Sequence, residues 1–174
     1  MKTLLLLRHA KSVLGQAGLP DHDRSLNRRG ERAAAIMADH IVAKSLRPDL
    51  ILCSTATRTR QTLAPLVEHL HSPAPPIALE RALYLASEGM LLTRLRDVPD
   101  EFGTVLLIGH NDGIWELAQV LAGHGRATAM AALHERFPTG ALATLQAPIE
   151  HWRDLAAGEA ELMAFVCPRD LVPD

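Results

Sequence analysis

The sequence runs Leu4-Leu5-Leu6-Leu7 and then Arg8-His9-Ala10-Lys11-Ser12, so a short apolar strand is followed by a cation and an imidazole. In open α/β sheets, ligands bind just outside the carboxyl ends of the strands. An arginine beside a histidine at that place indicates an anion held next to a nucleophile or a base. A solvated loop can carry the same pair, so the rest of the chain has to decide between the two interpretations.

Apolar, strand-like runs alternate with helical patterns along the chain. The predicted strands are residues 3–7, 49–53, 104–109, 141–146 and 162–166, with a weaker strand at 77–80. One helix is predicted after Asn27, a suitable N-cap, because apolar residues up to Ile41 recur at helical spacing; others are predicted at 57–71, 87–97 and 111–122. The alternation predicts an α/β fold, a three-layer sandwich in which a mostly parallel sheet is flanked by helices on both faces.

Length and composition describe an ordinary globular protein. The 174 residues, 48% apolar and 22% charged, predict one domain over 1–174, with the proline-rich residues 72–76 as a connector inside it. A net charge of -2, with no basic block and 3% aromatic residues, disfavours nucleic-acid binding. The apolar run before Arg8 is too short for a signal peptide or a membrane span, so we expect a cytoplasmic protein that does not bind membranes. In that compartment we expect Cys53 and Cys167 to be reduced core thiols.

The second informative segment follows the strand predicted at 49–53. It reads Ser54-Thr55-Ala56-Thr57-Arg58, a hydroxyl-rich turn that leads into a helix. Hydroxyls, helix N-terminal N–H groups and an arginine fork can together bind phosphate, although plain N-capping by Ser54 or Thr55 gives the same pattern. A cysteine-based phosphatase would need an arginine six positions after Cys53, where this chain has Thr59, so that alternative fails.

A third strand, predicted at 104–109, releases Gly109-His110-Asn111-Asp112 before a helix. Gly109 lets the backbone approach a ligand closely. Three strand ends thus offer two guanidiniums and two imidazoles, from Arg8, His9, Arg58 and His110. Chance would have to place these side chains at each of the three strand ends independently. The sequence therefore favours an anion site.

These motifs resemble the histidine phosphatase superfamily, whose fold is phosphoglycerate mutase-like. The resemblance rests on the Arg8-His9 pair, on the Ser54-x-x-x-Arg58-x-x-Gln61-Thr62 segment and on Gly109-His110-Asn111. With Ala10-Lys11-Ser12, Tyr84-Leu85-Ala86-Ser87 and Pro138-Thr139-Gly140-Ala141 included, the chain is similar over nearly its whole length to the small SixA-type phosphohistidine phosphatases. Thr55 and Asp112 stand where proline is common in the family.

The resemblance implies a role for each matched residue. His9 would attack phosphorus to form a phosphohistidine intermediate, while Arg8, Arg58 and His110 hold the phosphoryl oxygens. Ser12, Asn111 and Thr139 would contribute to substrate binding. Two neighbouring arginines disfavour the imidazolium and keep His9 nucleophilic near neutral pH. No cofactor and no metal ion are expected, because the other histidines form no persuasive ligand set.

The general acid is the open point of this interpretation. Glu88 is the nearest carboxylate to the family position, but an acidic residue in the first turn of a helix is favoured by the helix dipole alone. Asp23 and Arg24 match another family segment, in which capping or ion pairing explains them equally well.

The expected reaction is hydrolysis of phosphohistidine on a protein, with inorganic phosphate as product. A phosphoramidate bond breaks more readily than an ester bond, so its hydrolysis depends less on a general acid. The chain is also too short to carry the insertions that would cover the pocket, and an open site suits a protein substrate. The alternative is a small-molecule phosphomonoesterase. A non-catalytic phosphate-binding module is a third possibility, against which the retention of both histidines and both arginines argues.

Overall fold

One sheet organises the molecule. The computed structural model describes residues 1–70 and 73–172, and within them seven strands pair in the order β3-β2-β4-β1-β6-β7-β5. The strands are β1 (Lys2–Arg8), β2 (Leu50–Ser54), β3 (Ile77–Glu80), β4 (Thr104–Gly109), β5 (Ala122–Gly125), β6 (Leu142–Ala147) and β7 (Ala160–Val166). Strand β6 is antiparallel to both neighbours, and every other pairing is parallel. The mostly parallel sheet predicted from the sequence is confirmed.

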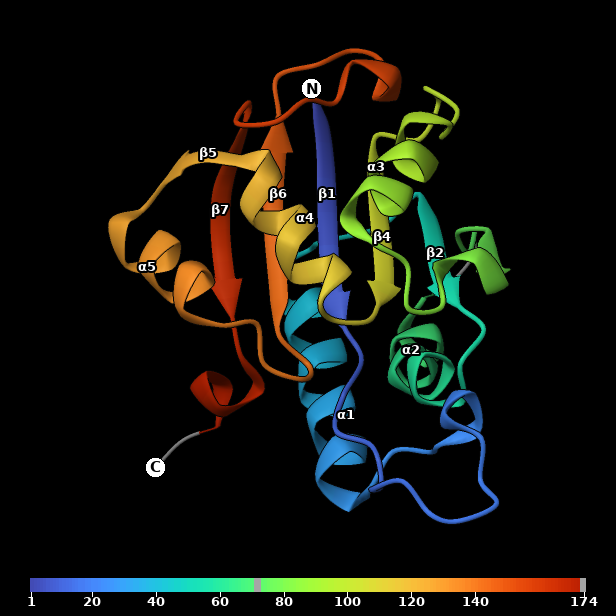
Figure 1. Ribbon diagram of the computed structural model, residues 1–174. Helices are drawn as coiled ribbons and strands as arrows, with labels where there is room; N and C mark the ends of the chain where they lie inside the picture. The colour runs from blue at the N-terminus through green and yellow to red at the C-terminus, as the bar shows by residue number, and fades with distance from the viewer. Residues whose placement is uncertain (71–72, 173–174) are drawn as a thin grey trace.

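Helices cover both faces of this sheet. They are α1 (Arg28–Ala43), α2 (Thr57–His69), α3 (Glu88–Arg96), α4 (Gly113–Leu121) and α5 (Ala127–Glu135). Figure 1 shows α3, α4 and α5 in front of the sheet and α1 and α2 behind it. Short 3-10 turns complete the chain: η1 (Asp21–Asp23), η2 (Arg81–Leu83), η3 (Trp152–Asp154) and η4 (Pro168–Leu171). The predicted three-layer sandwich is therefore confirmed.

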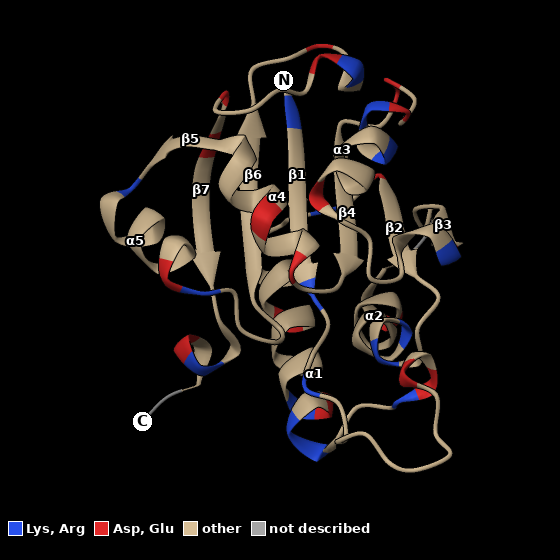
Figure 2. Cartoon of the chain, in the orientation of Figure 1, with Lys and Arg blue, Asp and Glu red and all other residues tan. Residues whose placement is uncertain are grey.

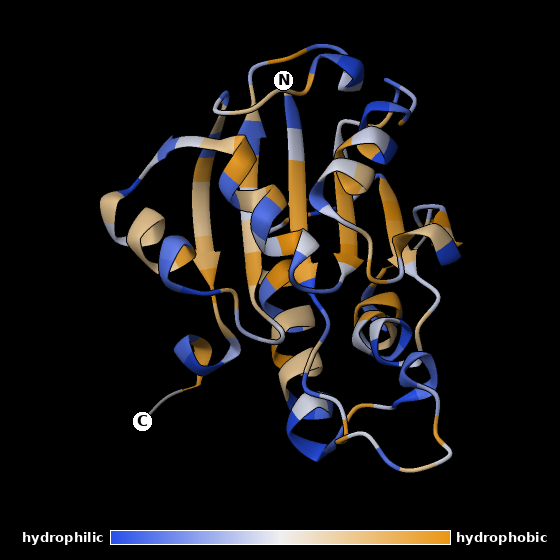
Figure 3. Ribbon diagram, in the orientation of Figure 1, coloured by the Kyte–Doolittle hydropathy of each residue, from blue (hydrophilic) through white to orange (hydrophobic). Residues whose placement is uncertain are grey.

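The leucine run of β1 is explained by these two covered faces. Leu4 and Leu6 pack into the core shared with α3 and α4, whereas Leu5 and Leu7 pack into the core shared with α1 and α2. All four side chains are buried. A strand that is covered on both sides reads as a continuous apolar run rather than as an alternating one. Figure 3 shows the resulting band of hydrophobic residues along the central strands.

All six predicted strands are present, with ends displaced by at most two residues. The helix expected to reach residue 71 is described as far as His69, and residues 71–72, including the start of the proline-rich connector, lie outside the described residues. Strand β5 and helix α5 were not predicted from the sequence. A side chain at Gly123 would put Cβ 1.7 Å from the Gly158 carbonyl oxygen, so β5 approaches its neighbours through residues that are poor strand formers.

The strand order brings the predicted site residues to one edge. Strands β2, β4 and β1 are neighbours and point in the same direction, with Arg8 opposite Gly109 and Cys53 opposite Ile108. The loops after these strands therefore emerge side by side at the lower end of the sheet in Figure 1. Figure 2 shows basic segments at the beginnings of α1 and α2 near that end. No helix in the described parts of the chain is long and apolar enough to cross a membrane.

Candidate active site

A cleft of about 260 Å³ opens at the carboxyl ends of β1, β2 and β4. The structure brings together there all four residues predicted to carry the chemistry, and also Ser12, Asn111 and Thr139. The lining residues are Arg8, His9, Lys11, Ser12, Val13, Leu14, Arg24, Arg58, Leu85, His110, Asn111 and Thr139. Glu88 is absent from this set; it is the first residue of α3.

The imidazole of His9 is held in one tautomer. Its Nδ1 lies 2.7 Å from the carbonyl oxygen of Ala10, which can only accept, so Nδ1 donates and Nε2 keeps its lone pair. Burial, together with the positive charges of Arg58 and Arg8, lowers the pKa of His9 to about 4, against the opposing effect of the Ala10 carbonyl. The ring is therefore neutral at pH 7, with an unprotonated nitrogen available as a nucleophile.

His110 lies beside His9, with ring centroids 5.3 Å apart. Its Nε2 is 2.8 Å from the hydroxyl of Ser54, the last residue of β2, and the ring is 3% exposed. Burial lowers the pKa of His110 to about 3, with further contributions from His9 and Arg58. This second imidazole is also neutral, and it serves as a hydrogen-bonding group rather than as a charge.

Arg58 reaches the cleft from the first turn of α2. Its guanidinium is 3% exposed and donates to the backbone carbonyl of Asp21 at 2.6 Å and to the Asp21 carboxylate at 3.0 Å. The same carboxylate accepts a hydrogen bond from the Tyr84 hydroxyl at 2.5 Å. Because it accepts from Tyr84 and Arg58, the pKa of Asp21 lies below its ordinary value. Asp21, in η1, thus fixes a cation that α2 supplies.

The loop after β1 is fixed in the same way. Arg8 donates to the carbonyl of Phe137 at 2.8 Å, and the backbone N–H of Ala10 donates to the Thr62 hydroxyl at 2.9 Å. Arg24 donates to the Ser12 hydroxyl at 2.5 Å and pairs with Asp21 at 3.3 Å. The side chains around His9 are therefore positioned before any substrate arrives.

Unpaired polar atoms concentrate in this cleft. Within the described residues, five buried side-chain nitrogen or oxygen atoms lack a hydrogen-bond partner: Nε of Arg8, Arg24 and Arg58, Nδ1 of His110 and Oδ1 of Asn111. All five belong to residues that line the cleft. Buried groups without partners are rare in folded proteins and each needs an explanation. Three of these atoms are guanidinium N–H donors, which fit a site whose missing partner is an oxygen-rich anion.

Three functional residues were missed or underrated in the sequence. Asp21 and Tyr84 were not assigned to the site, and Arg24 was weighed only as a capping or pairing residue. Asp21 and Arg24 belong to a segment between β1 and α1 whose approach to Arg58 depends on tertiary structure. The spacing Asp21-x-x-Arg24, in which both charges pair on one short turn, was the available signal.

Other candidate chemistry receives no support from the geometry. Burial raises the pKa of Cys53 to about 12, so this thiol is not a nucleophile. No group of three or more His, Cys, Asp or Glu side chains that could hold a metal ion occurs in residues 1–70 and 73–172. Thr55 stands at a position where the family often has proline, and its hydroxyl lies 2.9 Å from Nε2 of His22, which connects this turn to η1.

Comparison with known proteins places the chain in a family. The sequence pattern of the histidine phosphatase superfamily (branch 1) matches residues 4–84. An uncharacterized protein of Mycobacterium tuberculosis is 40% identical over 165 residues, which cover 94% of this chain and 100% of that protein.

Two solved structures share the fold and 30–32% of the sequence. A structure from Agrobacterium tumefaciens, described as a candidate phosphohistidine phosphatase SixA, has 32% identity and a TM-score of 0.81, covering 96% of this chain and 98% of that one. A counterpart from Nakamurella multipartitia with the same description has 30% identity and a TM-score of 0.82, covering 96% of each chain. These similarities support a phosphatase activity. The chain belongs to the histidine phosphatase superfamily, and within it to the SixA type.

Proposed function

We propose that this protein removes phosphate from phosphohistidine on a protein substrate, with His9 as the nucleophile and without a metal ion. The observation that carries the proposal is the set of unpaired nitrogens around an imidazole whose Nε2 is free. Arg8, Arg24 and Arg58 supply the positive charge that a phosphoryl group needs while it is transferred.

The reaction proceeds by two displacements at phosphorus. In the first, Nε2 of His9 forms a bond to phosphorus while the bond between phosphorus and the substrate nitrogen breaks, and the departing nitrogen takes a proton from solvent. In the second, a water oxygen attacks phosphorus, the bond to Nε2 breaks, and inorganic phosphate leaves. The fixed guanidiniums stabilise the charge on the three equatorial oxygens in both steps.

The lining of the cleft supports phosphohistidine as the substrate. The described residues that line it include Lys11 and five further arginines and histidines, but no carboxylate. The carboxylate of Asp21 is occupied by Arg58 and Tyr84. An alkyl phosphate ester needs an acid to protonate its leaving oxygen, whereas an imidazole departs more readily. The small-molecule phosphomonoesterase remains the second candidate, with Glu88 as its acid.

A panel of substrates tests this proposal. We expect phosphohistidine peptides to be hydrolysed with a kcat/KM at least about a hundredfold above that of glycerol or sugar phosphates, and a chelator to leave the rate unchanged. Faster hydrolysis of the alkyl esters would favour the esterase, and loss of activity in the chelator would contradict catalysis without a metal. Phosphate binding without turnover of any substrate would indicate the non-catalytic module.

A further inference from the structure

A second pocket adjoins the cleft that contains His9. It has a volume of about 200 Å³, and Lys11 and Thr139 line both hollows. The rest of its wall comes from the start of α1, from the segment after α5 and from η4. These residues are Arg29, Ala33, Arg136, Pro138, Cys167, Pro168 and Arg169. A ligand that extends from the phosphate site past Thr139 therefore enters this second pocket.

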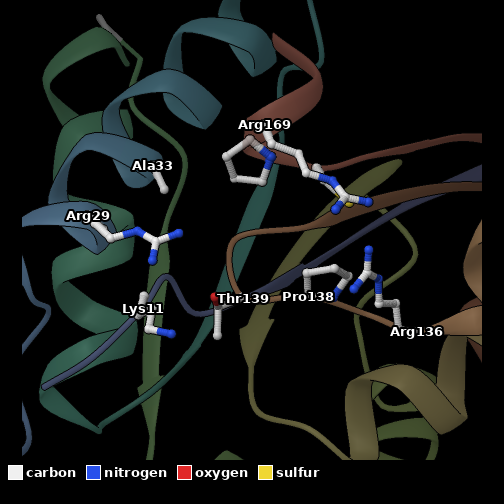
Figure 4. A pocket seen from close by; sticks show the side chains of 9 residues that line it. Lys11, Arg29, Ala33, Arg136, Pro138, Thr139 and Arg169 are labelled. Atoms are coloured by element: carbon white, nitrogen blue, oxygen red, sulfur yellow. The ribbon is translucent and has the colours of Figure 1, made fainter. Parts of the chain in front are cut away.

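The second pocket is basic. Four of its lining residues are cationic, and Figure 4 shows Arg29 on one side of Thr139 and Arg136 and Arg169 on the other. Glu135 lies 3.8 Å from Arg136, and Asp170 lies 3.6 Å from Arg169. Within the described residues, Lys11 and Arg29 form no ion pair. Two positive charges therefore remain uncompensated in a protein whose net charge is -2.

Charge and size together indicate the ligand. Arginine forks bind carboxylates bidentately, and the pocket volume is several times the roughly 30 Å³ that one water occupies, so a whole acidic side chain fits. Exposed cations bind a free carboxylate weakly. A carboxylate on a molecule that is already bound at His9 has a high effective concentration at the pocket, so the same contacts then add to the affinity.

We propose that this basic pocket, lined by Lys11, Arg29, Arg136 and Arg169, binds an acidic side chain of the polypeptide whose phosphohistidine lies at His9. The inference rests on the proposed function and names a feature of the substrate that the reaction itself does not require. A polypeptide is favoured because the ligand has to continue from the reacting phosphate past Thr139 to η4.

Two phosphohistidine peptides that differ only in charge test the inference. One carries aspartate and glutamate within three positions on both sides of the phosphohistidine, and the other carries asparagine and glutamine there. In the wild-type protein we expect kcat/KM for the acidic peptide to be about tenfold higher, a ratio that corresponds to 1.4 kcal/mol. In Arg29→Gln/Arg169→Gln the ratio should fall to within about twofold. Because the ratio is formed within each variant, any change at the reacting centre cancels.

Arg153 provides the matched control. It lies in a 3-10 turn, is 75% exposed and pairs with the next residue at 4.0 Å, as Arg169 does at 67% and 3.6 Å. That turn, η3, is at the opposite end of the sheet (Figure 1). Arg153→Gln should keep the tenfold preference. The preference should also weaken as salt is raised, since exposed charges are screened.

Four outcomes would overturn the inference. Equal rates on the two peptides in the wild type would show that the pocket does not bind acidic side chains. A preference that survives in the double variant would show the same. Both results would leave the phosphohistidine activity in place. Turnover of p-nitrophenyl phosphate without any turnover of either peptide would refute the proposed function itself. An Arg169-dependent preference for small bisphosphates, with none for the acidic peptide, would assign the pocket to a second phosphate.

Discussion

At the scale of single residues, His9 determines whether chemistry occurs. We expect His9→Ala to keep the fold, because the ring lines the cleft and belongs to neither hydrophobic core, and to reduce turnover to below about a thousandth. Brief reaction with a radiolabelled substrate should leave acid-labile, base-stable label on the wild-type protein and none on the variant. Label trapped on any other residue would refute the assignment of the nucleophile.

The buried imidazoles should titrate in acid. The pKa of His9 is lowered to about 4 and that of His110 to about 3, so both rings stay neutral from pH 8 to about pH 5. An NMR titration of the free protein should show the ring signals of both residues unchanged across that range. A titration of either ring near pH 6.5, the ordinary value for histidine, would contradict the effect of burial.

The same shifts link stability to pH. In the unfolded chain these histidines titrate near pH 6.5, so between about pH 6.5 and pH 4 the unfolded state binds more protons than the folded one. The free energy of unfolding should therefore fall as the pH is lowered through that window. Urea titrations at pH 7, 6 and 5 measure it. The slope should be shallower in His110→Asn, and a slope equal to that of the wild type would count against the linkage.

Coupling between two residues can be measured at Arg58. Loss of one preorganised cation should lower kcat/KM about a hundredfold or more in Arg58→Ala, whereas Arg60→Ala, an exposed arginine on the same helix, should have little effect. Asp21 acts mainly through Arg58, with a longer contact to Arg24 at 3.3 Å, so Asp21→Ala should cost about tenfold alone and much less when Arg58 is already alanine. Strictly additive losses would instead give Asp21 a separate role.

The sequence predicted the four central residues because each follows a strand in the chain itself. Arg8, His9 and His110 stand directly after apolar runs, and Arg58 stands in the turn beyond one. Asp21 and Tyr84 carry no such local signal. They meet Arg58 only because η1 and the segment after β3 fold over the same strand ends. Long-range contacts of this kind are not encoded in periodicity.

At the scale of elements, one helix is seated against the loop that holds His9. Gly30, in the first turn of α1, would place a Cβ 2.0 Å from the Lys11 carbonyl oxygen. Alanine usually stabilises a helix relative to glycine by up to about 1 kcal/mol, but here it has to push α1 off the loop. We expect Gly30→Ala to lose about 1–3 kcal/mol and to impair activity.

Gly89 is the matched control for that substitution. It also lies in the first turn of a helix with a side-chain N-cap, and a Cβ there would meet nothing within 4 Å. Gly89→Ala should therefore be neutral or slightly stabilising in a urea titration. If the two variants were equally stable, close approach between α1 and the loop would not be what requires glycine.

Two elements, strand β5 and helix α5, were not predicted, each for a different reason. Strand β5 contains two glycines that lie against β7 and the Gly158 turn, and α5 buries a single residue, Leu133. The glycines leave β5 without an alternating apolar pattern. Helix α5 packs against the core through Ala129, Met130 and Leu133, a stripe too short to stand out from the alanines around it. The central strands, in contrast, are covered on both faces and were predicted almost to the residue.

At the scale of the whole molecule, the described residues that line the cleft include no carboxylate, and this should determine which substrates are used. If no group protonates the leaving atom, rates should depend steeply on leaving-group quality: high for phosphohistidine and aryl phosphates, and low for sugar and glycerate phosphates. Glu88→Gln should change little, since Glu88 does not line the cleft. Comparison of kcat/KM across aryl phosphates of graded leaving-group pKa gives the dependence directly. Efficient hydrolysis of an alkyl phosphate that falls about a hundredfold in Glu88→Gln would make this protein an esterase, and would leave the role of His9 as it is.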